Sequence, residues 1–241
     1  TKFARFTKET GYRTEAEKFG WSFVFYLFIA ERAGISSLQS PSGTPWWKRI
    51  DGSSWRHPEG PSSNVKDRMN HPVVHVSWND AIEYCNWSGK RLPTEAEWEF
   101  AARGGLEKKI FPWGDELTPK GIHRCNIWQG TFPNYNSEED GFAGTAPAKQ
   151  YEPNDYGLYN VAGNVWEWQS DWFSSTFHSR GSLTEPDHNP QGPKRGTTKT
   201  IKGGSYLCHD SYCNRYRVAA RSANTPDSST GNLGFRCASD A

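Results

Sequence analysis

The sequence has no excess of charge of either sign and no long hydrophobic run. Its 28 lysines and arginines stand against 27 aspartates and glutamates, which leaves a formal net charge of +1. Attraction to nucleic acid or to an anionic membrane needs a clear positive excess, so neither partner is expected. The longest apolar stretch, Trp21 to Ala30, is interrupted by Ser22 and falls short of the ~20 residues that span a bilayer. With a mean hydropathy of −0.84, the chain is expected to be soluble.

Long periodic segments are also scarce, because glycine and proline interrupt the chain throughout. Its 241 residues include 23 Gly and 15 Pro, together with 12 Trp, 10 Tyr, 13 Phe and a single Met. This composition predicts an irregular fold in which large aromatic side chains hold ordered loops in place. No Pro/Ser-rich linker or charged block divides the chain, so residues 1–241 are expected to form one domain. Because the chain begins at Thr1 without Met, we expect upstream sequence to be missing.

Two of the five cysteines, Cys208 and Cys213, lie five positions apart in a polar and aromatic segment, residues 201–217. Two thiols this close in sequence can form a small disulfide, bind one metal ion through two soft sulfur ligands, or act as nucleophile and resolving thiol. A structural disulfide and half of a zinc site are the plainer interpretations. Zinc is the less favoured of these two, because it usually needs a second Cys/His pair and the sequence has none.

Hydrogen-bonding groups surround this cysteine pair. The two preceding glycines, Gly203 and Gly204, allow a sharp turn or a close approach of the backbone. A purely structural disulfide does not need many polar neighbours, so we place the chemistry of the protein in this segment. The polar and aromatic neighbours are Ser205, Tyr206, His209, Ser211 and Tyr212.

Three segments carry the local signals of helices: residues 1–10, 77–89 and 94–103. The first has phenylalanines at helical spacing. The second begins near Ser77 or Asn79, either of which can cap it, and directs Cys85 inward. The third begins with Thr94, and a glutamate three residues later completes the pattern of a capping box. Glycines at the end of these segments are expected to terminate the helices.

Residues 36–70 are rich in Ser, Pro, Gly and Trp and are interpreted as an ordered loop. Their tryptophans could form a carbohydrate-binding platform, but packing is the favoured role because aromatic side chains in loop-rich folds more often serve it. A similar argument applies to His71 and His75. We interpret both as surface or hydrogen-bonded structural histidines rather than metal ligands.

Residues 111–172 combine Gly, Asn, Asp and aromatic residues with little periodicity, so this stretch needs an external organiser. Side-chain and carbonyl oxygens brought together by glycine turns, as in residues 126–130, 138–142 and 160–168, are the ligands that Ca²⁺ takes. None of these segments matches an EF-hand loop. The spacing alone therefore favours solvated acidic loops.

The thiol segment and the stretch from Arg221 to Cys237 resemble the C-terminal core of the formylglycine-generating enzyme (sulfatase-modifying factor) family. The resemblance implies a single compact α/β (α+β) fold with little regular secondary structure, distantly related to C-type-lectin-like domains. It also implies a copper-dependent oxidase that converts the cysteine of an unfolded Cys-x-Pro-x-Arg segment in a sulfatase to Cα-formylglycine, using O₂ and a thiol reductant. The similarity runs from about Phe3 to Asp240 and is densest in residues 71–105, 111–113, 126–147, 156–172 and 203–237.

The resemblance also implies site residues. The family's copper-binding cysteines match Cys208 and Cys213, which would hold Cu(I) as two thiolates and leave room for the substrate sulfur and O₂. His209, beside the first cysteine, is a less favoured candidate. The other matched positions are Ser205 and Tyr212, which would orient the bound thiol and oxygen, Trp166, which would wall the oxygen pocket, and Asn232, which would line the site.

The resemblance also implies two structural calcium ions. It therefore reverses the preference, drawn from spacing alone, for solvated acidic loops in residues 111–172. For one ion the family's ligands match Asn126, the carbonyl of Ile127, Asp140 and the carbonyl of Phe142. For the second ion they match Asn160, Gly163, Val165 and Glu167, through carbonyls and the Glu167 carboxylate.

The sequence departs from eukaryotic members of the family in its cysteines. Those members carry a second structural disulfide, whose positions here are Ala102 and Val218. The resemblance leaves Cys85 and Cys237 as the structural pair, bridged or at least adjacent, and gives Cys125 no role. The missing bridge favours a bacterial-type enzyme in the cytoplasm, with the endoplasmic-reticulum lumen as the compartment of a eukaryotic one.

Three classes of function stay open: the copper oxidase, a catalytically silent paralogue that binds sulfatases, and a lectin-like binding module. The thiol pair favours the oxidase, because a silent paralogue is expected to lose one or both thiols and a lectin does not need them. The related iron-dependent sulfoxide synthases need a three-histidine iron site, which the seven histidines do not obviously form. We expect a monomer whose partners are the sulfatase segment, O₂ and a thiol reductant, with no nucleic acid and no membrane.

Overall fold

The computed structural model of the chain describes residues 1–29, 39–179 and 187–240. Its helices and strands are short and long loops connect them, which confirms the predicted mixed fold with little regular secondary structure. No helix in the described residues is long and apolar enough to cross a membrane. The helices are α1 (Lys2–Thr10), α2 (Glu15–Phe19), α3 (Trp78–Trp87) and α4 (Glu95–Arg103), with 3₁₀ turns η1 (Tyr26–Phe28), η2 (Lys66–Arg68), η3 (Pro119–Gly121) and η4 (Phe177–Ser179). The strands are β1 (Trp21–Phe25), β2 (Trp47–Asp51), β3 (Gly130–Thr131), β4 (Tyr135–Asn136), β5 (Trp166–Trp172), β6 (Lys199–Lys202), β7 (Ser222–Asn224) and β8 (Leu233–Gly234).

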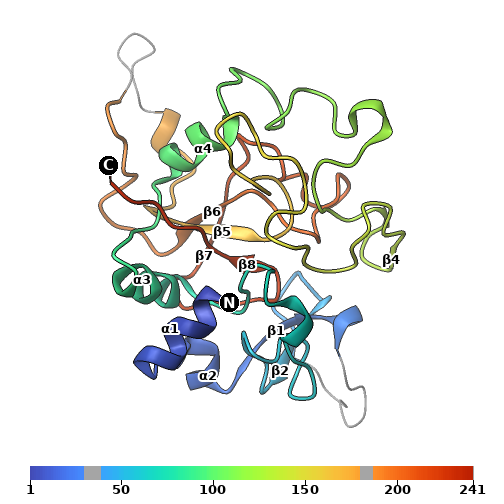
Figure 1. The fold of residues 1–241 in the computed structure, drawn as a ribbon, viewed down its shortest axis with the longest axis vertical. Helices are drawn as coiled ribbons and strands as arrows, with labels where there is room; N and C mark the ends of the chain where they lie inside the picture. The colour runs from blue at the N-terminus through green and yellow to red at the C-terminus, as the bar shows by residue number, and fades with distance from the viewer. Residues whose placement is uncertain (30–38, 180–186, 241) are drawn as a thin grey trace.

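A four-stranded sheet with the order β7, β6, β5, β8 lies at the centre of the molecule (Figure 1). Strand β5 pairs antiparallel with β6, with Trp168 opposite Ile201, and the register shifts between Trp168 and Trp172. On its other side β5 pairs parallel with β8, with Trp166 opposite Leu233. The parallel pair brings the residues just before β8 next to the start of β5.

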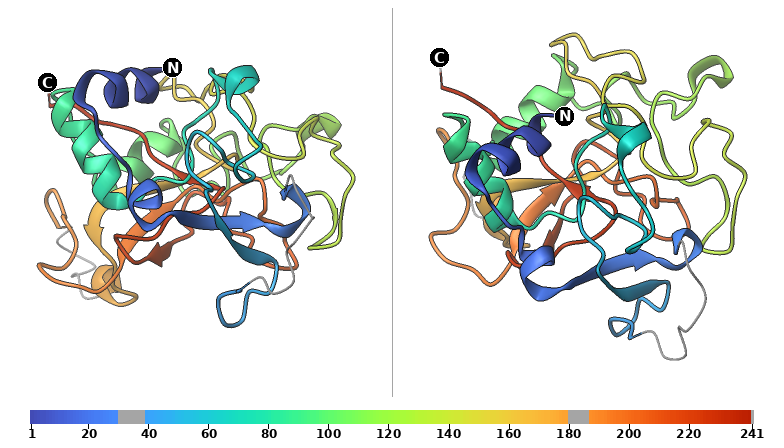
Figure 2. Two further views of the ribbon diagram at one scale, coloured as in Figure 1. Left: turned by 90° about the horizontal axis from the view of Figure 1, so that it is seen from below. Right: turned by 60° about the horizontal axis from the view of Figure 1, so that its bottom comes forward.

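A second sheet, made of β1 and β2, lies at one side of the central sheet (Figure 2). Its strands are antiparallel, with Phe23 opposite Arg49. Phe23 also forms an isolated parallel bridge with Thr230, three residues before β8 begins. Strand β1 therefore supports the segment that leads into β8.

The helices predicted at residues 77–89 and 94–103 are α3 and α4, and capping explains where they begin. The Asp80 backbone N–H donates to the Ser77 hydroxyl at 3.0 Å, and α3 starts directly after this serine. Thr94 and Glu97 form the predicted capping box at α4. Helix α3 ends two residues earlier than predicted, and the first predicted helix is α1. Helix α2 begins with the same Thr-x-x-Glu capping box, so this rule would have predicted it too.

Aromatic side chains pack the loops against one another, as the composition predicts. Trp55 is buried, and its ring meets that of Phe3 edge to face at 5.3 Å. Trp46 meets Phe132 in the same way at 5.2 Å. These contacts favour packing over a carbohydrate platform. Residues 36–70 were predicted to be loop throughout, and strand β2 shows that this was wrong for Trp47–Asp51. The strand was missed because its hydrogen-bonding partner, β1, is distant in sequence. Residues 36–38 lie outside the described residues.

Charged side chains are buried between α4 and β6. Lys202 is fully enclosed, and its Nζ donates to the Glu99 carboxylate at 3.0 Å and lies 3.9 Å from that of Glu95. Glu95 is also buried, and Arg221 binds both of its carboxylate oxygens. Lys202 and Glu95 are buried and the side chains of Glu99 and Arg221 are partly exposed, so removing Glu95 would weaken the compensation of a buried ammonium.

Candidate functional site

An open groove of about 380 Å³ beside the central sheet brings the predicted catalytic residues together. Its lining includes all of them: Ser205, Cys208, Tyr212, Cys213, Trp166 and Asn232. Trp46 from the loop before β2, Thr230 from the segment before β8 and Arg215 from the loop between β6 and β7 complete the walls. The groove thus collects side chains from parts of the chain that are far apart in sequence.

Strand pairing places Trp166 and Asn232 in this groove. Trp166 is the first residue of β5, and its backbone N–H donates to the carbonyl of Asn232 at 2.8 Å. The next residue, Leu233, pairs with Trp166 in the parallel ladder. Both groove residues are almost fully buried, so the packing around them restricts the positions of their side chains.

A glycine turn positions the thiol segment at the end of β6. Gly203 and Gly204 have φ angles of 91° and 72°, in the left-handed region. A Cβ atom at Gly204 would lie 2.9 Å from the backbone nitrogen of Tyr216, so a side chain does not fit here. Ser205 follows the turn directly, and its N–H donates to the Cys208 Sγ at 3.4 Å.

Cys208 and Cys213 are joined as a disulfide, and their Cα atoms are 5.4 Å apart. Cys208 is buried, whereas Cys213 is half-buried. The His209 carbonyl accepts the N–H groups of Tyr212 at 3.0 Å and Cys213 at 2.8 Å, which tightens the turn between the sulfurs. No group of three or more His, Cys, Asp or Glu side chains that could hold a metal occurs in the described residues. The zinc interpretation therefore lacks its other ligands in this part of the chain, and a structural disulfide, a redox pair or a two-sulfur site for a soft metal remains.

Side chains beside the sulfurs form a directed chain of hydrogen bonds. Thr230 Oγ1 donates to Asn232 Oδ1 at 2.7 Å, and Asn232 Nδ2 donates to Ser205 Oγ at 2.8 Å. The Leu207 N–H also donates to Ser205 Oγ, at 3.3 Å. Ser205 Oγ thus accepts two hydrogen bonds, and its own hydrogen has no acceptor among the described residues. This hydroxyl can donate to a molecule bound in the groove.

Tyr212 forms the outer wall of the groove. Its ring stacks on Phe132, with the ring centroids 4.4 Å apart, and meets Trp46 edge to face at 4.9 Å. Burial raises the pKa of Tyr212, so the phenol stays protonated at neutral pH and can donate a hydrogen bond. Trp46 and Phe132 were not predicted as site residues. The adjacent tryptophans at 46 and 47 were a signal for the first, but their sequence context indicated only packing.

The three histidines considered from the sequence do not line the groove. The His209 ring bonds to Ser211 at 2.8 Å and pairs with Asp210 at 3.0 Å, so it faces its own turn. His71 bonds to Thr145 at 2.9 Å. His75 is fully buried and bonds through both ring nitrogens. The interpretation of His71 and His75 as hydrogen-bonded structural histidines is confirmed.

The other three cysteines are thiols in the structure. The Sγ atoms of Cys85 and Cys237 are 3.5 Å apart, so the predicted adjacency is confirmed although no bond joins them. Their hydrogen bond raises the pKa of Cys85 and lowers that of Cys237. Burial raises the pKa of Cys125, which makes this thiol unreactive. The positions of the missing second disulfide, Ala102 and Val218, are both buried in the same hydrophobic cluster.

The first predicted calcium-binding set combines one unpartnered oxygen with a carboxylate and a carbonyl that already accept hydrogen bonds. Asn126 is fully buried, and its Oδ1 has no hydrogen-bond partner in the described residues. Asp140 accepts from the N–H of Ile127 and from Gln129 Nε2, both at 2.9 Å, and its other oxygen accepts from the N–H of Phe142 at 3.0 Å. Burial raises the pKa of Asp140. A buried unpaired oxygen and a half-buried carboxylate fit a cation that binds oxygen, so this set fits Ca²⁺.

The second predicted set adjoins the first, because Gly163 forms an isolated bridge with Asn126. Gly163 has a φ of 72°, and a Cβ there would lie 2.3 Å from the Asn126 carbonyl oxygen. Asn160 Oδ1 is buried and has no hydrogen-bond partner in the described residues, which fits a cation ligand. Val165 is buried in the same segment.

The carboxylate of Glu167, the fourth member of this set, already has partners. Arg236 binds its two oxygens through Nε and Nη2 at 2.6 Å each, and Trp98 Nε1 donates to one of them at 2.6 Å. An ion at the second set would have to share this carboxylate with Arg236. The second set therefore fits Ca²⁺ through Asn160 and the nearby backbone, and less well through Glu167.

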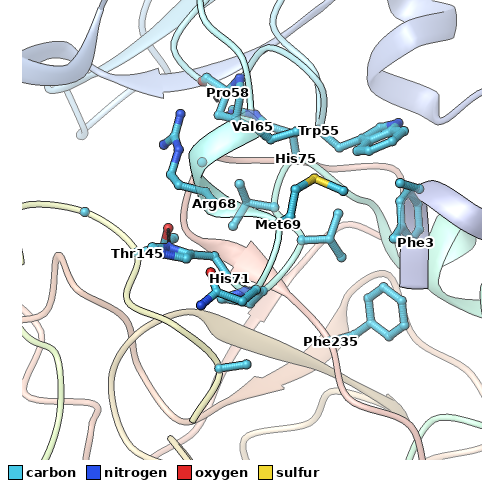
Figure 3. Close-up of a pocket in the computed structure, with 18 of the residues that line it drawn as sticks. Phe3, Trp55, Pro58, Val65, Arg68, Met69, His71, His75, Thr145 and Phe235 are labelled. Atoms are coloured by element: carbon cyan, nitrogen blue, oxygen red, sulfur yellow. Dashed lines mark hydrogen bonds between the residues drawn. The ribbon is translucent and has the colours of Figure 1, made fainter. Parts of the chain in front are cut away.

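A larger cavity of about 940 Å³ lies on another part of the surface (Figure 3). Its labelled lining is mainly apolar and includes Phe3, Trp55, Met69 and Phe235. It contains neither Cys208 nor Cys213 nor any other predicted catalytic residue. The smaller groove is the candidate site because of its chemistry, not its size.

Curated relatives match nearly the whole chain. The "Formylglycine-generating enzyme" of Thermomonospora curvata is 60% identical over 240 residues, which cover 99% of this chain and 78% of that protein. The protein of the same name from Streptomyces coelicolor is 61% identical over 100% of this chain and 75% of its own length. A Bos taurus protein named "Inactive C-alpha-formylglycine-generating enzyme 2" is 44% identical over 99% of this chain and 73% of its own length.

Among solved structures, PvdO from Pseudomonas aeruginosa matches 97% of this chain and 74% of that chain with a TM-score of 0.65. At 20% identity this match shows the fold alone. A family model described as "Sulfatase-modifying factor enzyme 1-like domain" matches residues 1–241. With this model spanning the chain and relatives at about 60% identity, the chain belongs to the formylglycine-generating enzyme (sulfatase-modifying factor) family.

Proposed function

We propose that this protein oxidises the cysteine of a Cys-x-Pro-x-Arg segment in an unfolded sulfatase to Cα-formylglycine, with O₂ as oxidant and an external thiol as reductant. The observation that carries the proposal is the pair Cys208 and Cys213 in an open groove lined by polar side chains. The names of the relatives at about 60% identity support the same reaction.

The overall reaction balances with one O₂ and two equivalents of external thiol. The substrate carbon loses its sulfur as H₂S and gains one oxygen as the aldehyde, while the second oxygen atom leaves as water. The two external thiols become a disulfide and supply two electrons. An external thiol would also reduce the bridge between Cys208 and Cys213, which must open before either sulfur can bind a metal.

We propose Cu(I) as the metal held by Cys208 and Cys213, because thiolates are soft donors that select it. An ion held only by these two residues would leave room for the substrate sulfur, and it would supply an electron to O₂. The difference in burial supports this arrangement: Cys208 anchors the site in the core, and half-buried Cys213 faces the groove. Among the described residues that line the groove there is no Asp, Glu or His, so its two sulfurs are the strongest metal ligands it offers.

The polar residues of the groove would orient the substrate. Ser205 can donate its hydroxyl hydrogen to the substrate sulfur or to oxygen, because its two accepted hydrogen bonds hold the Oγ in place. The Tyr212 phenol can donate from the outer wall. Trp166, which is almost fully buried, would wall the part of the groove where O₂ binds.

A catalytically silent sulfatase-binding role is the second candidate, since one relative at 44% identity is named inactive. Incubating the protein with Cu(I), O₂, a thiol and a synthetic Cys-x-Pro-x-Arg peptide separates the two. We expect mass spectrometry to show replacement of the sulfur by oxygen, and an aldehyde that reacts with a hydrazide probe. A peptide with serine in place of the cysteine should remain unchanged. Peptide binding without any mass change would identify the silent protein instead.

We propose two structural calcium ions at the sets of Asn126 and Asn160, and chelation tests them. If Ca²⁺ binds only the folded state, its removal from about a hundredfold excess over Kd costs about 2.7 kcal/mol. This cost applies to each of the two ions, so for a chain of this size EGTA should lower Tm by roughly 10–20 °C. Asp140→Asn should reduce this difference, whereas the exposed control Asp155→Asn should retain it. An unchanged Tm after exhaustive chelation would remove both ions from the proposal.

A further inference from the structure

One wall of the groove, residues 229–232, is held from behind by buried polar side chains. These are Ser22 on β1 and His75 in the loop before α3, and neither lines the groove. We propose that His75 and Ser22 are positioning residues, which hold this segment so that the Asn232 amide is correctly oriented toward Ser205. The inference rests on the proposed function for its effect on turnover, and it deepens that function by adding two residues outside the groove.

The His75 ring is fixed by two directed hydrogen bonds. Nε2 lies 2.8 Å from the carbonyl oxygen of Pro58, which can only accept, so Nε2 carries the hydrogen. The two residues lie next to each other at the wall of the larger cavity (Figure 3). Nδ1 is 2.8 Å from Ser22 Oγ. Burial lowers the pKa of His75 to about 4, so the ring is neutral at pH 7 and Nδ1 accepts from Ser22.

The row of hydrogen bonds continues from Ser22 to residues 229–232, which form the groove wall. Ser22 is fully buried, and its Oγ lies 2.8 Å from the Oγ of Ser229. Ser22 Oγ also lies 3.0 Å from the Ser229 carbonyl oxygen. This carbonyl and the unprotonated Nδ1 of His75 can only accept, so they share the single Ser22 hydrogen, and the Ser229 hydroxyl donates to Ser22. The direction of every bond from Pro58 to Ser229 is therefore set by the Pro58 carbonyl.

Backbone contacts add to this support. The His75 N–H donates to the Thr230 carbonyl at 3.0 Å, and the Gly231 N–H donates to the Phe23 carbonyl at 3.1 Å. His75 itself has a φ of 57°, which is uncommon for a residue with a side chain and persists only where the surroundings hold it. The segment is thus fixed by side chains and backbone from the same two elements.

The far end of the segment carries the groove residues. Thr230 Oγ1 and Ser205 Oγ hold the two ends of the Asn232 amide at 2.7 and 2.8 Å. A shift of the segment by a fraction of an ångström would move this amide, and with it the hydroxyl of Ser205. A displacement of about 1 Å at a reacting group can lower the rate by about a hundredfold. The buried hydrogen bonds from His75 to Ser229 should therefore have a measurable effect on catalysis.

Ser22→Ala tests the proposal with the smallest change. We expect kcat on the peptide to fall by about tenfold to a hundredfold with KM changed less than about twofold, because geometry is lost and binding area is kept. The matched control is Ser53→Ala, since Ser53 is a buried serine whose hydroxyl has no hydrogen-bond partner in the described residues. This control should keep the parental kcat.

A double-variant cycle separates positioning from general loss of stability. Ser22→Ala combined with Asn232→Ala should be no slower than Asn232→Ala alone, because the amide that Ser22 positions is already absent. His75→Asn keeps an acceptor for Ser22 at a positive φ that Asn tolerates, so it should retain more activity than His75→Leu. Multiplicative effects in the cycle, or parental kcat in Ser22→Ala, would overturn the proposal.

Amide hydrogen exchange provides a test that does not depend on turnover. Exchange at residues 230–232 should be at least several-fold faster in Ser22→Ala than in the parent, and unchanged in Ser53→Ala. Equal exchange in Ser22→Ala and the parent would overturn the positioning role, whether or not the parent oxidises the peptide. A parent that does not oxidise the peptide but shows the faster exchange in Ser22→Ala would contradict the proposed function and leave the structural coupling intact.

Discussion

Replacing Cys208 or Cys213 by serine should lower the rate of peptide oxidation by more than about a hundredfold. Replacing even a residue that only hydrogen-bonds to a metal ligand typically lowers metal affinity or activity by about 10–100-fold. A serine hydroxyl is a hard and poorly acidic donor, so the proposed Cu(I) site would lose one of its two soft ligands. Cu(I) affinity and turnover should therefore fall together in each variant. Competition against a chromogenic Cu(I) chelator measures the first, and mass spectrometry of the peptide measures the second.

The fold should survive these cysteine replacements. Closing so short a loop stabilises the oxidised protein by only about 2 kcal/mol in the chain-entropy view, and the reduced parent lacks that contribution as well. The control is Cys125→Ala, which removes a buried thiol that lies outside the groove and should leave copper binding unchanged. Full turnover in Cys208→Ser or Cys213→Ser would place the chemistry elsewhere in the molecule.

Glu95→Gln should destabilise the protein by roughly 3–5 kcal/mol, which is the cost of breaking a buried ion pair by removing one partner. The change leaves the enclosed ammonium of Lys202 with one carboxylate instead of two, and it removes the carboxylate that Arg221 binds. Urea unfolding of the parent and the variant at pH 7 measures the difference. A matched control is Glu9→Gln, whose partner Arg5 lies on the exposed face of α1 and should contribute almost nothing.

The effect of Glu95→Gln should also depend on pH. Burial by itself raises the pKa of Glu95, but Arg221 and Lys202 outweigh it and hold the pKa below its usual value of 4.5. The folded state therefore binds the proton less well than the unfolded state, so the stabilisation is fully present above pH 4.5 and is lost as pH falls through the lowered pKa. The free energies of unfolding of parent and variant should converge in acid. A difference that stays constant down to the acid transition would contradict this account.

The parts of the fold that depend on a few neighbouring residues could be predicted from the sequence. Helices α3 and α4 start where Ser77 and Thr94 cap them, and a cap needs only residues three positions apart. The proximity of Cys208 and Cys213 is equally local. Strand β2 was missed because its partner β1 is more than twenty residues away in sequence, and Trp47 to Asp51 lacks the alternation of a half-buried strand.

The sequence by itself determined the family, the thiol pair and the irregular character of the fold, because motifs and composition are properties of residue order. Only the tertiary structure decided that Trp166 and Asn232 lie side by side, since a parallel pairing of β5 with β8 leaves no local pattern. It also decided the wall made by Trp46, and the buried chain from His75 to Ser229. Such contacts close long loops at an entropic cost that is offset only when the whole core forms, so no short stretch of sequence records them.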